Sequence, residues 1–129
     1  MKATGERLFM DSSAWLSYFL AENNLSKKFI EDGNHLLMTS VLSIFEIKRK
    51  MLMKNFKEHR IEGFLDFIKS RSLTIELNEK ICKDAAAISL NHRLHTVDSL
   101  IYSSAILNNA TLISGDNHFE GLENVLILK

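Results

Sequence analysis

Five short apolar runs, separated by longer stretches with helical spacing, constrain the fold of this chain more than any other feature of its sequence. The runs lie near residues 7–11, 36–39, 72–77, 111–114 and 124–128. The helical stretches lie near residues 13–22, 25–32, 40–54, 57–70, 78–92 and 96–108. Strands that alternate with helices need crossover connections, which are typical of a mostly parallel sheet. We therefore predict an α/β fold, a three-layer α/β/α sandwich around a sheet of about five strands.

The length and composition indicate one globular domain that spans residues 1–129. Hydrophobic residues make up 46% of the chain, which is enough to build a core. Sixteen basic residues balance sixteen acidic ones, so a nucleic acid would have to bind to a local patch rather than to the overall charge. The single Cys82 excludes an internal disulfide. Residues 1–7 lack the apolar core of a signal peptide, and no apolar run reaches membrane-spanning length. We expect a cytoplasmic protein that makes no membrane contact.

Four acidic residues stand beside apolar runs, where a carboxylate is hard to explain as ordinary surface. They are Asp11, Glu46, Asp98 and Asp116. Asp11 and Asp116 follow the first and fourth predicted strands, and catalytic groups collect at the carboxyl ends of strands in open α/β sheets. Glu46 and Asp98 lie near the starts of two predicted helices. Because strand ends and helix starts meet at one edge of such a sheet, the four side chains can converge on one crevice.

Each of these carboxylates also has a structural explanation of its own. Asp11 can cap the helix that follows it, and Asp116 can form a turn. Glu46 can pair with Lys50 one helical turn away, and Asp98 is favoured by the positive end of its own helix. For any one residue alone we favour the structural explanation, but four independent coincidences are harder to accept than one shared site.

A cluster of carboxylates calls for a cation. Carboxylates a few ångströms apart repel one another and raise one another's pKa, and a divalent cation removes that conflict. Oxygen ligands without a neighbouring His or Cys favour Mg²⁺ or Mn²⁺ over Zn²⁺. Magnesium bridges a few carboxylates to a substrate phosphate in phosphodiester hydrolysis. The pattern therefore predicts a metal-dependent nuclease site.

Four segments of the chain resemble motifs of the PIN-domain nucleases. Residues 9–16 are similar to the first strand and helix of that family, and residues 97–105 are similar to its third acidic motif. Residues 110–119 resemble its closing strand and Thr-x-Asp-x-x-Phe pattern, with Ser114 in the threonine position. Residues 40–47 supply the helical glutamate. The resemblance covers essentially the whole chain and is closest to the VapC-like ribonuclease toxins of prokaryotic toxin–antitoxin pairs.

This resemblance implies a PIN-like fold and a metal-dependent endoribonuclease that leaves a 5′-phosphate and a 3′-hydroxyl. The residues that it assigns to Mg²⁺ or Mn²⁺ are Asp11, Glu46, Asp98 and Asp116. It gives Ser13 the role of positioning an acidic group or its water, with Ser12 as a second choice for that role. Asn117 follows the last acidic residue, where a neutral amide adds less affinity for a cation than a carboxylate does. The resemblance also implies an RNA substrate, a homodimer and a small antitoxin partner.

Two further groups of residues bear on binding partners. Basic residues concentrate on and just after the predicted helix 40–54, and are either contacts for RNA phosphates or a solvated helix face. These are Lys48, Arg49, Lys50, Lys54, Lys57 and Arg60. Apolar residues on two predicted helices exceed what one sheet can cover, so we expect an exposed patch that receives a partner. These are Trp15, Tyr18, Phe19, Ile44, Ile47 and Met51.

Other classes of protein agree with only part of this pattern. A PIN-like module without catalysis, acting in binding or as a scaffold, would not need all four acidic residues. A phosphatase of the haloacid dehalogenase type should have Asp-x-Asp after its first strand, where this chain has Asp11, Ser12 and Ser13. A phosphorelay receiver is also disfavoured, because it needs an acidic pair near the first strand. The sequence leaves open whether a nuclease of this kind is a toxin or an RNA-processing enzyme.

Overall fold

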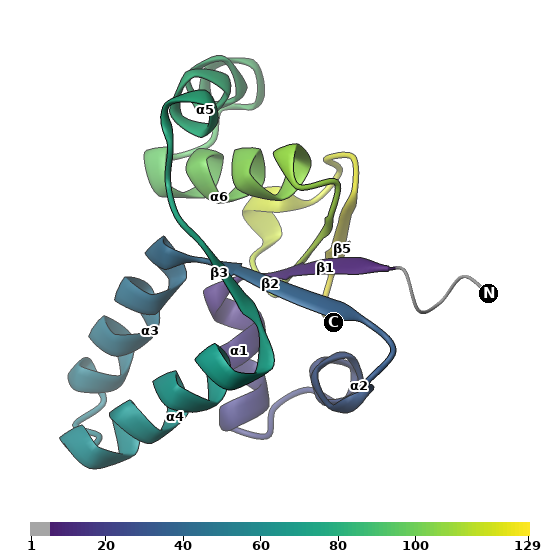
Figure 1. The fold of residues 1–129 in the computed structure, drawn as a ribbon. Coiled ribbons are helices and arrows are strands. Elements are labelled where there is room, and N and C mark those ends of the chain that lie inside the picture. The colour runs from purple at the N-terminus through teal and green to yellow at the C-terminus, as the bar shows by residue number, and fades with distance from the viewer. Residues whose placement is uncertain (1–5) are drawn as a thin grey trace.

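The computed structural model, which describes residues 6–129, contains a five-stranded sheet in the order β3-β2-β1-β4-β5 (Figure 1). Every neighbouring pair of strands is parallel. The strands are β1 (Arg7–Met10), β2 (Leu36–Ser40), β3 (Leu73–Ile75), β4 (Thr111–Ser114) and β5 (Val125–Ile127). Each strand coincides with one of the five apolar runs, so the predicted strands are confirmed.

Within residues 6–129, six α-helices and one short 3₁₀-helix accompany the strands. They are α1 (Ser12–Phe19), α2 (Asn24–Glu31), α3 (Val41–Met53), α4 (Glu58–Arg71), α5 (Glu79–His92), α6 (Thr96–Leu107) and η2 (Asn117–Phe119). The largest difference from the predicted boundaries is at the end of α1. Leu20 caps this helix and Ala21 adopts a left-handed conformation with φ of 56°, which an α-helix cannot continue through. The 3₁₀-helix was not predicted.

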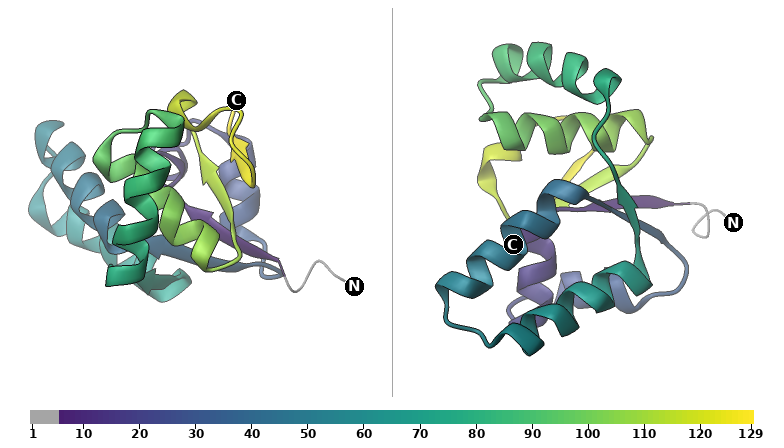
Figure 2. Two further views of the ribbon diagram at one scale, coloured as in Figure 1. Left: turned by 90° about the horizontal axis from the view of Figure 1, so that it is seen from above. Right: turned by 60° about the vertical axis from the view of Figure 1, so that its left-hand side comes forward.

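Helices cover both faces of the sheet, which confirms the predicted three-layer sandwich. Helices α1 to α4 lie on one face, and α5 and α6 lie on the other (Figures 1 and 2). Side chains that alternate along β1 enter two separate cores. Leu8 and Met10 join the core beneath α1 to α4, whereas Phe9 joins the core beneath α6. A strand that is buried on both faces is typical of a parallel sheet.

The sheet changes its direction of growth beside β1. The chain places β2 and β3 on one side of β1, and then returns to place β4 and β5 on the other side. In open α/β sheets, ligands bind in the crevice outside the carboxyl ends of the strands at such a switch point. Asp11 directly follows β1, and Asp116 follows β4 after one glycine. The fold therefore brings these two aspartates to the same edge of the sheet.

The expectation of an exposed patch formed by the first and third helices is wrong in its composition. Trp15, Ile47 and Met51 are each at most 1% exposed. Aromatic residues of α4 account for this burial on α1, because Phe67 packs edge-on against the Trp15 ring with 6.4 Å between centroids. The remaining expected members, Tyr18, Phe19 and Ile44, are partly buried against the same core.

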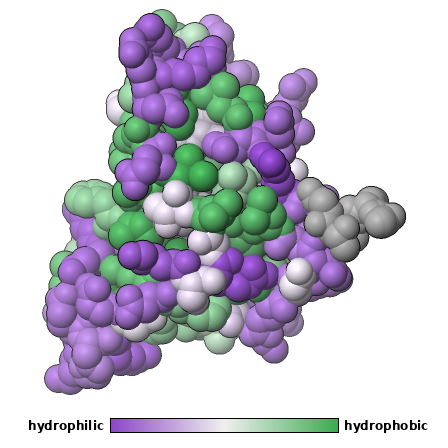
Figure 3. Space-filling view, viewed as in Figure 1, coloured by the Kyte–Doolittle hydropathy of each residue, from purple (hydrophilic) through white to green (hydrophobic). Residues whose placement is uncertain are grey.

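A different apolar surface is exposed on α3. Phe45, Leu52 and Met53 are 66%, 48% and 63% exposed. Together with Ile44 and Arg49, they line an open groove of about 450 Å³, which we call the α3 apolar groove. On the face seen in Figure 3, hydrophobic residues gather at the centre, and hydrophilic residues cover α5 and the ends of α3 and α4.

No helix within residues 6–129 is both long and apolar enough to cross a bilayer.

Candidate metal centre

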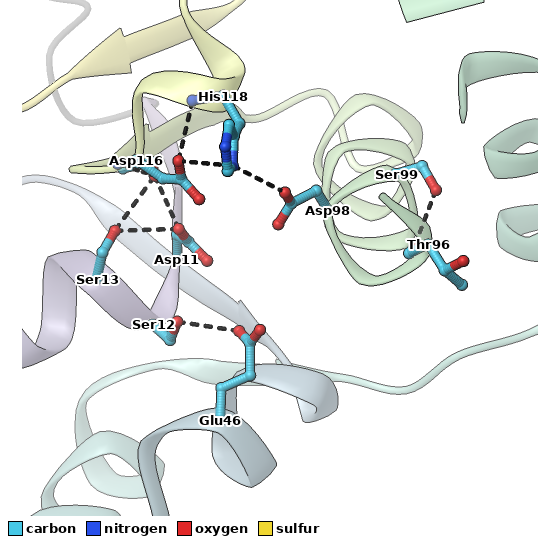
Figure 4. Close-up of polar contacts among 10 residues, drawn as sticks. Asp11, Ser12, Ser13, Glu46, Thr96, Asp98, Ser99, Asp116 and His118 are labelled. Carbon is cyan, nitrogen blue, oxygen red and sulfur yellow. Dashed lines mark hydrogen bonds and ion pairs between the residues drawn. The ribbon is translucent and has the colours of Figure 1, made fainter. Parts of the chain in front are cut away.

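Four carboxyl groups from four separate parts of the chain point toward a common space at the carboxyl edge of the sheet (Figure 4). They belong to Asp11 after β1, Glu46 in α3, Asp98 in the first turn of α6, and Asp116 just before η2. The tightest group consists of Asp98, Asp116 and His118, each of which offers a ligand atom within 4.8 Å of the others. The structure thus brings together the four acidic residues that the sequence pattern singled out. Their role in binding a metal stays a prediction.

Asp11 is almost fully buried, with 4% of its surface exposed. Its Oδ2 atom accepts hydrogen bonds from Ser114 Oγ at 2.7 Å and from Ser13 Oγ at 3.0 Å. Burial raises the pKa of the Asp11 carboxyl, the two serine hydroxyls partly offset this effect, and the charge of Asp116 adds to it. A buried carboxylate with hydroxyl donors on one oxygen is held in one orientation, with its charge directed at the crevice.

Glu46 reaches the same space from the second turn of α3. Its Oε1 atom accepts a hydrogen bond of 3.0 Å from Ser12 Oγ. Burial raises the pKa of Glu46, and the charges of Asp11, Asp98 and Asp116 raise it further. The carboxyl group of Glu46 therefore shares the electrostatic environment of the other three.

Asp98 and Asp116 lie on either side of a histidine. The Nδ1 atom of His118 is 3.1 Å from Oδ1 of Asp116 and 3.6 Å from Oδ2 of Asp98. The ring of His118 packs edge-on against that of His95, with 5.7 Å between centroids. Burial raises the pKa of Asp98, followed by the charges of Asp116 and Asp11, while His118 and His95 act in the opposite direction. The crevice thus has an imidazole nitrogen beside its carboxylate oxygens.

The structure also tests the separate structural explanations for the four residues. Asp11 makes no side-chain capping bond to α1. Among the ion pairs within residues 6–129, none joins Glu46 to Lys50, and Glu46 binds Ser12 instead. Asp116 does form a turn, because its Oδ1 atom accepts a hydrogen bond of 2.9 Å from the backbone N–H of His118. Capping and pairing therefore do not account for the carboxylates of Asp11 and Glu46.

The sequence profile described as the PIN domain matches residues 8–124. This chain belongs to the PIN-domain family. The match includes all of β1 except Arg7, the six α-helices described above and the four acidic residues of the crevice, so the family resemblance inferred from the sequence is confirmed.

Solved structures with the same fold as this PIN domain include proteins from three bacteria. A toxin–antitoxin complex from Klebsiella pneumoniae matches with a TM-score of 0.76 and 18% identity, over 92% of this chain and 95% of the other. VapBC2 from Rickettsia felis, bound to a DNA fragment from its promoter, matches with a TM-score of 0.77 and 19% identity, over 94% and 96% of the two chains. VapBC-1 from nontypeable Haemophilus influenzae matches with a TM-score of 0.71 and 15% identity, over 95% and 97%. The comparison with curated protein sequences gave no match.

The serine residues of this PIN domain hold its carboxylates. Ser13 donates a hydrogen bond to Asp11, as the positioning role proposed for it requires. Its hydroxyl oxygen also accepts a hydrogen bond of 2.8 Å from the backbone N–H of Gly115. Ser12 donates its hydrogen bond to Glu46 rather than to Asp11. Asn117 is exposed at the start of η2, and a ligand role for it stays a prediction.

Sequence reasoning missed two residues of the crevice. Ser114 was noted only as the residue in a threonine position, yet its hydroxyl binds Asp11 and accepts 2.9 Å from the backbone N–H of Asp116. His118 was not considered, because it follows Asp116 in what reads as an ordinary turn. A polar residue within a few positions of a strand-end aspartate was the available signal in both missed cases.

The donor set of this PIN domain fits a divalent cation that prefers oxygen ligands. Three of the four carboxyl groups, those of Asp11, Glu46 and Asp98, have a pKa raised by burial and by neighbouring negative charge. A cation in the crevice would relieve both costs. Carboxylate oxygens favour Mg²⁺ or Mn²⁺, whereas the imidazole nitrogen of His118 is a donor that transition metals accept more readily than Mg²⁺ does. The presence of His118 differs from the donor set expected from the sequence, which had no neighbouring histidine.

Proposed function

We propose that this PIN domain is a divalent-metal-dependent endoribonuclease, in which Asp11, Glu46, Asp98 and Asp116 hold Mg²⁺ or Mn²⁺. One observation carries the proposal. Four carboxyl groups meet at one crevice, and in three of them burial and neighbouring negative charge raise the pKa. Such a group is costly to keep ionised without a cation, and the switch point of a parallel sheet is a site where a substrate can reach it.

The residues around the carboxylates would prepare them for hydrolysis. When bound, the cation would supply Lewis-acid stabilisation of the charge that develops on the phosphate and would activate a water molecule. Ser13 and Ser114 fix the Asp11 carboxylate and Ser12 fixes that of Glu46, so these oxygens need little reorganisation. In the proposed reaction, the water oxygen joins phosphorus and the bond to the 3′ oxygen breaks. The 3′ oxygen takes up a proton, which leaves a 5′-phosphate and a 3′-hydroxyl.

Substitution of the carboxylates tests the nuclease proposal directly. Asp11→Asn and Asp98→Asn should each reduce cleavage of a mixed single-stranded RNA pool by more than about 100-fold, because each removes a ligand rather than a group that only supports one. Asp66→Asn, which alters an exposed carboxylate of α4, is the matched control and should keep full activity. Chelator should abolish cleavage by the wild-type chain. Retained activity in both active-site variants, or in chelator, would overturn the proposal.

We further propose that the chain is the toxin of a toxin–antitoxin pair and forms a homodimer. Support comes from the fold, which is shared with a toxin–antitoxin complex and with two VapBC proteins. The exposed apolar residues of α3 offer a small antitoxin a surface on which to bind. The alternatives are an RNA-processing nuclease that needs no antitoxin and a PIN-like scaffold without catalysis.

Growth of cells that express the chain separates these alternatives. A toxin should arrest growth when expressed alone and should be neutralised by the product of the neighbouring gene. Asp98→Asn should be tolerated in both cases. A processing nuclease would cleave RNA in vitro but would be tolerated without a partner, and a scaffold would do neither.

A further inference from the structure

The structure separates the basic residues on and after α3 into two groups. Lys48 is engaged with α4, because its Nζ atom lies 2.8 Å from Glu58 Oε2 and 3.1 Å from Glu62 Oε2. The guanidinium of Arg60 lies over the rings of Phe56 and Phe64, at 5.0 and 5.6 Å from their centroids. These two cations therefore support packing between helices. The sequence could not distinguish them from their neighbours.

Three of the other four cations of this cluster are placed to bind a ligand, whereas the fourth, Lys57, precedes α4 and lines neither of the cavities described next. Among the ion pairs in the part of the chain that the structure describes, none involves Arg49, Lys50 or Lys54. All three are exposed on the side of α3 that faces α1 across two adjoining cavities. An exposed cation without an ion pair is available to a phosphate.

The two cavities form one groove that begins at the candidate metal centre. The first, of about 340 Å³, is lined by Glu46, Arg49 and Lys50 together with Ser12 and Phe45. The second, of about 310 Å³, is lined by Lys50 and Lys54 and reaches Gly115. Ser13, Leu16 and Lys50 line both cavities, so they adjoin. Glu22 also lines the second cavity, and its negative charge marks the end of the row of cations there. A polyanion in this groove would pass the free cations and arrive at Glu46.

Charge explains why such a groove is needed. The chain has no net charge, and the carboxylates of its candidate metal centre repel a phosphate, so cations beside the crevice would help to attract a phosphate backbone. Lys50 lies in the last turn of α3 and Lys54 is the residue that caps the end of this helix, and both line the second cavity. Cations that follow one another along a groove can contact successive phosphates of one strand.

An aromatic ring at the start of the groove indicates the form of the nucleic acid. Phe45 precedes Glu46 in α3 and is 66% exposed. Only an unpaired base can present its face to a side chain, and base–aromatic stacking is a common device in proteins that bind single strands. A duplex has its bases stacked internally and would leave this ring unused.

Resting on the proposed nuclease function, we propose that the groove between α1 and α3 binds a single RNA strand next to the scissile phosphate. Arg49, Lys50 and Lys54 contact its phosphates, and Phe45 stacks on one unpaired base. We call these four residues the RNA groove. Arg49 and Phe45 also line the α3 apolar groove, so a protein bound there would cover the entry of the strand.

Equilibrium binding of RNA in chelator tests the proposal apart from catalysis. The probe is a fluorescent single-stranded RNA of mixed sequence, titrated with the full-length chain at several salt concentrations. Arg49→Ala, Lys50→Ala and Lys54→Ala should each weaken binding and reduce the slope of log K against log salt by about 0.7. Phe45→Ala should weaken binding by about 5- to 150-fold, with an unchanged salt slope. Lys48→Ala is the matched control from the same helix and should change neither quantity.

The possible outcomes distinguish this proposal from the one on which it rests. If the wild-type chain cleaves RNA but the RNA groove variants bind like the control, the groove is wrong and the nuclease function stands. If binding depends on the groove but Mg²⁺ and Mn²⁺ support no cleavage, the groove stands and the nuclease function is wrong. Equal binding of duplex RNA, insensitive to Phe45→Ala, would overturn the single-strand assignment. If the RNA groove variants lose binding of an antitoxin but still bind RNA, the groove is a binding site for the protein partner instead.

Discussion

The hydroxyl of Ser114 donates a hydrogen bond of 2.7 Å to Oδ2 of Asp11, across two strands whose residues are 103 positions apart in the sequence. The hydroxyl oxygen of Ser114 also accepts a hydrogen bond of 2.9 Å from the backbone N–H of Asp116. One fully buried side chain thereby fixes both of the aspartates that follow β1 and β4.

Ser114→Ala should reduce nuclease activity or metal affinity by about 10- to 100-fold, because Asp11, a proposed metal ligand, loses the group that orients it. It should also cost about 1–3 kcal/mol of stability, since Asp11 and the Asp116 N–H each lose a buried partner. Ser114→Thr keeps the hydroxyl and should retain most activity. Ser104→Ala is the control, because the Ser104 hydroxyl is also buried but binds only the Leu100 carbonyl of its own helix. Equal losses of activity in the two alanine variants would refute a positioning role for Ser114.

Asp98→Asn should stabilise the metal-free protein near neutral pH and lose that advantage in acid. Burial raises the pKa of Asp98, and the charges of Asp116 and Asp11 raise it further. The ionised carboxylate therefore destabilises the folded wild-type chain at neutral pH. As the pH falls through the raised pKa toward the ordinary value of 3.8, the folded chain takes up a proton and regains this stability. The difference in melting temperature should then shrink.

Thermal melts of both chains in chelator, between about pH 7 and pH 4, measure this difference. Asp66→Asn, at an exposed position, should melt like the wild type throughout. A wild-type chain that is more stable than Asp98→Asn at neutral pH in chelator would contradict the raised pKa.

Addition of Mg²⁺ or Mn²⁺ should raise the melting temperature, because a cation that binds only the folded chain stabilises it by mass action. The gain is about 2.7 kcal/mol when the cation is at 100 times its Kd. His118→Ala should reduce the shift caused by Mn²⁺ more than that caused by Mg²⁺, since Mg²⁺ keeps oxygen ligands and Mn²⁺ accepts an imidazole nitrogen. His59→Ala, which removes an exposed histidine of α4, serves as the control. Equal effects of His118→Ala on both cations would exclude His118 as a ligand.

Leu52→Glu and Met53→Glu should weaken binding of the proposed antitoxin by at least about 30-fold, the effect of losing an interface residue worth 2 kcal/mol. Both residues are exposed in the α3 apolar groove, and a buried charge there would have no partner. Leu90→Glu is the matched control, because Leu90 is 82% exposed on α5, far along the chain from the groove. Calorimetry with the purified product of the neighbouring gene measures the affinities, and light scattering on the same samples tests the homodimer. Equal weakening by Leu90→Glu would show that the groove is not the binding surface.

Local patterns were sufficient to predict the architecture. Each strand of the parallel sheet is a short run of apolar residues, and the helical stretches between them are long enough to cross over. The four acidic residues of the crevice could also be chosen from the sequence, because strand ends and helix starts share one edge in any sheet of this kind. These inferences need only the period of the pattern and the order of the elements.

Other features depended on contacts between residues far apart in the chain. Burial of Trp15 depends on the packing of Phe67 in α4 against its ring, which a helix's own periodicity does not reveal. Whether a cation of α3 is free was likewise decided across helices, because Lys48 meets two glutamates of α4 and Lys50 does not. The link from Ser114 to Asp11 exists only because β4 pairs with β1. Spacing along the chain determines which faces are apolar and where strands end, whereas partners of individual side chains are set by the three-dimensional packing of segments that sequence order does not bring together.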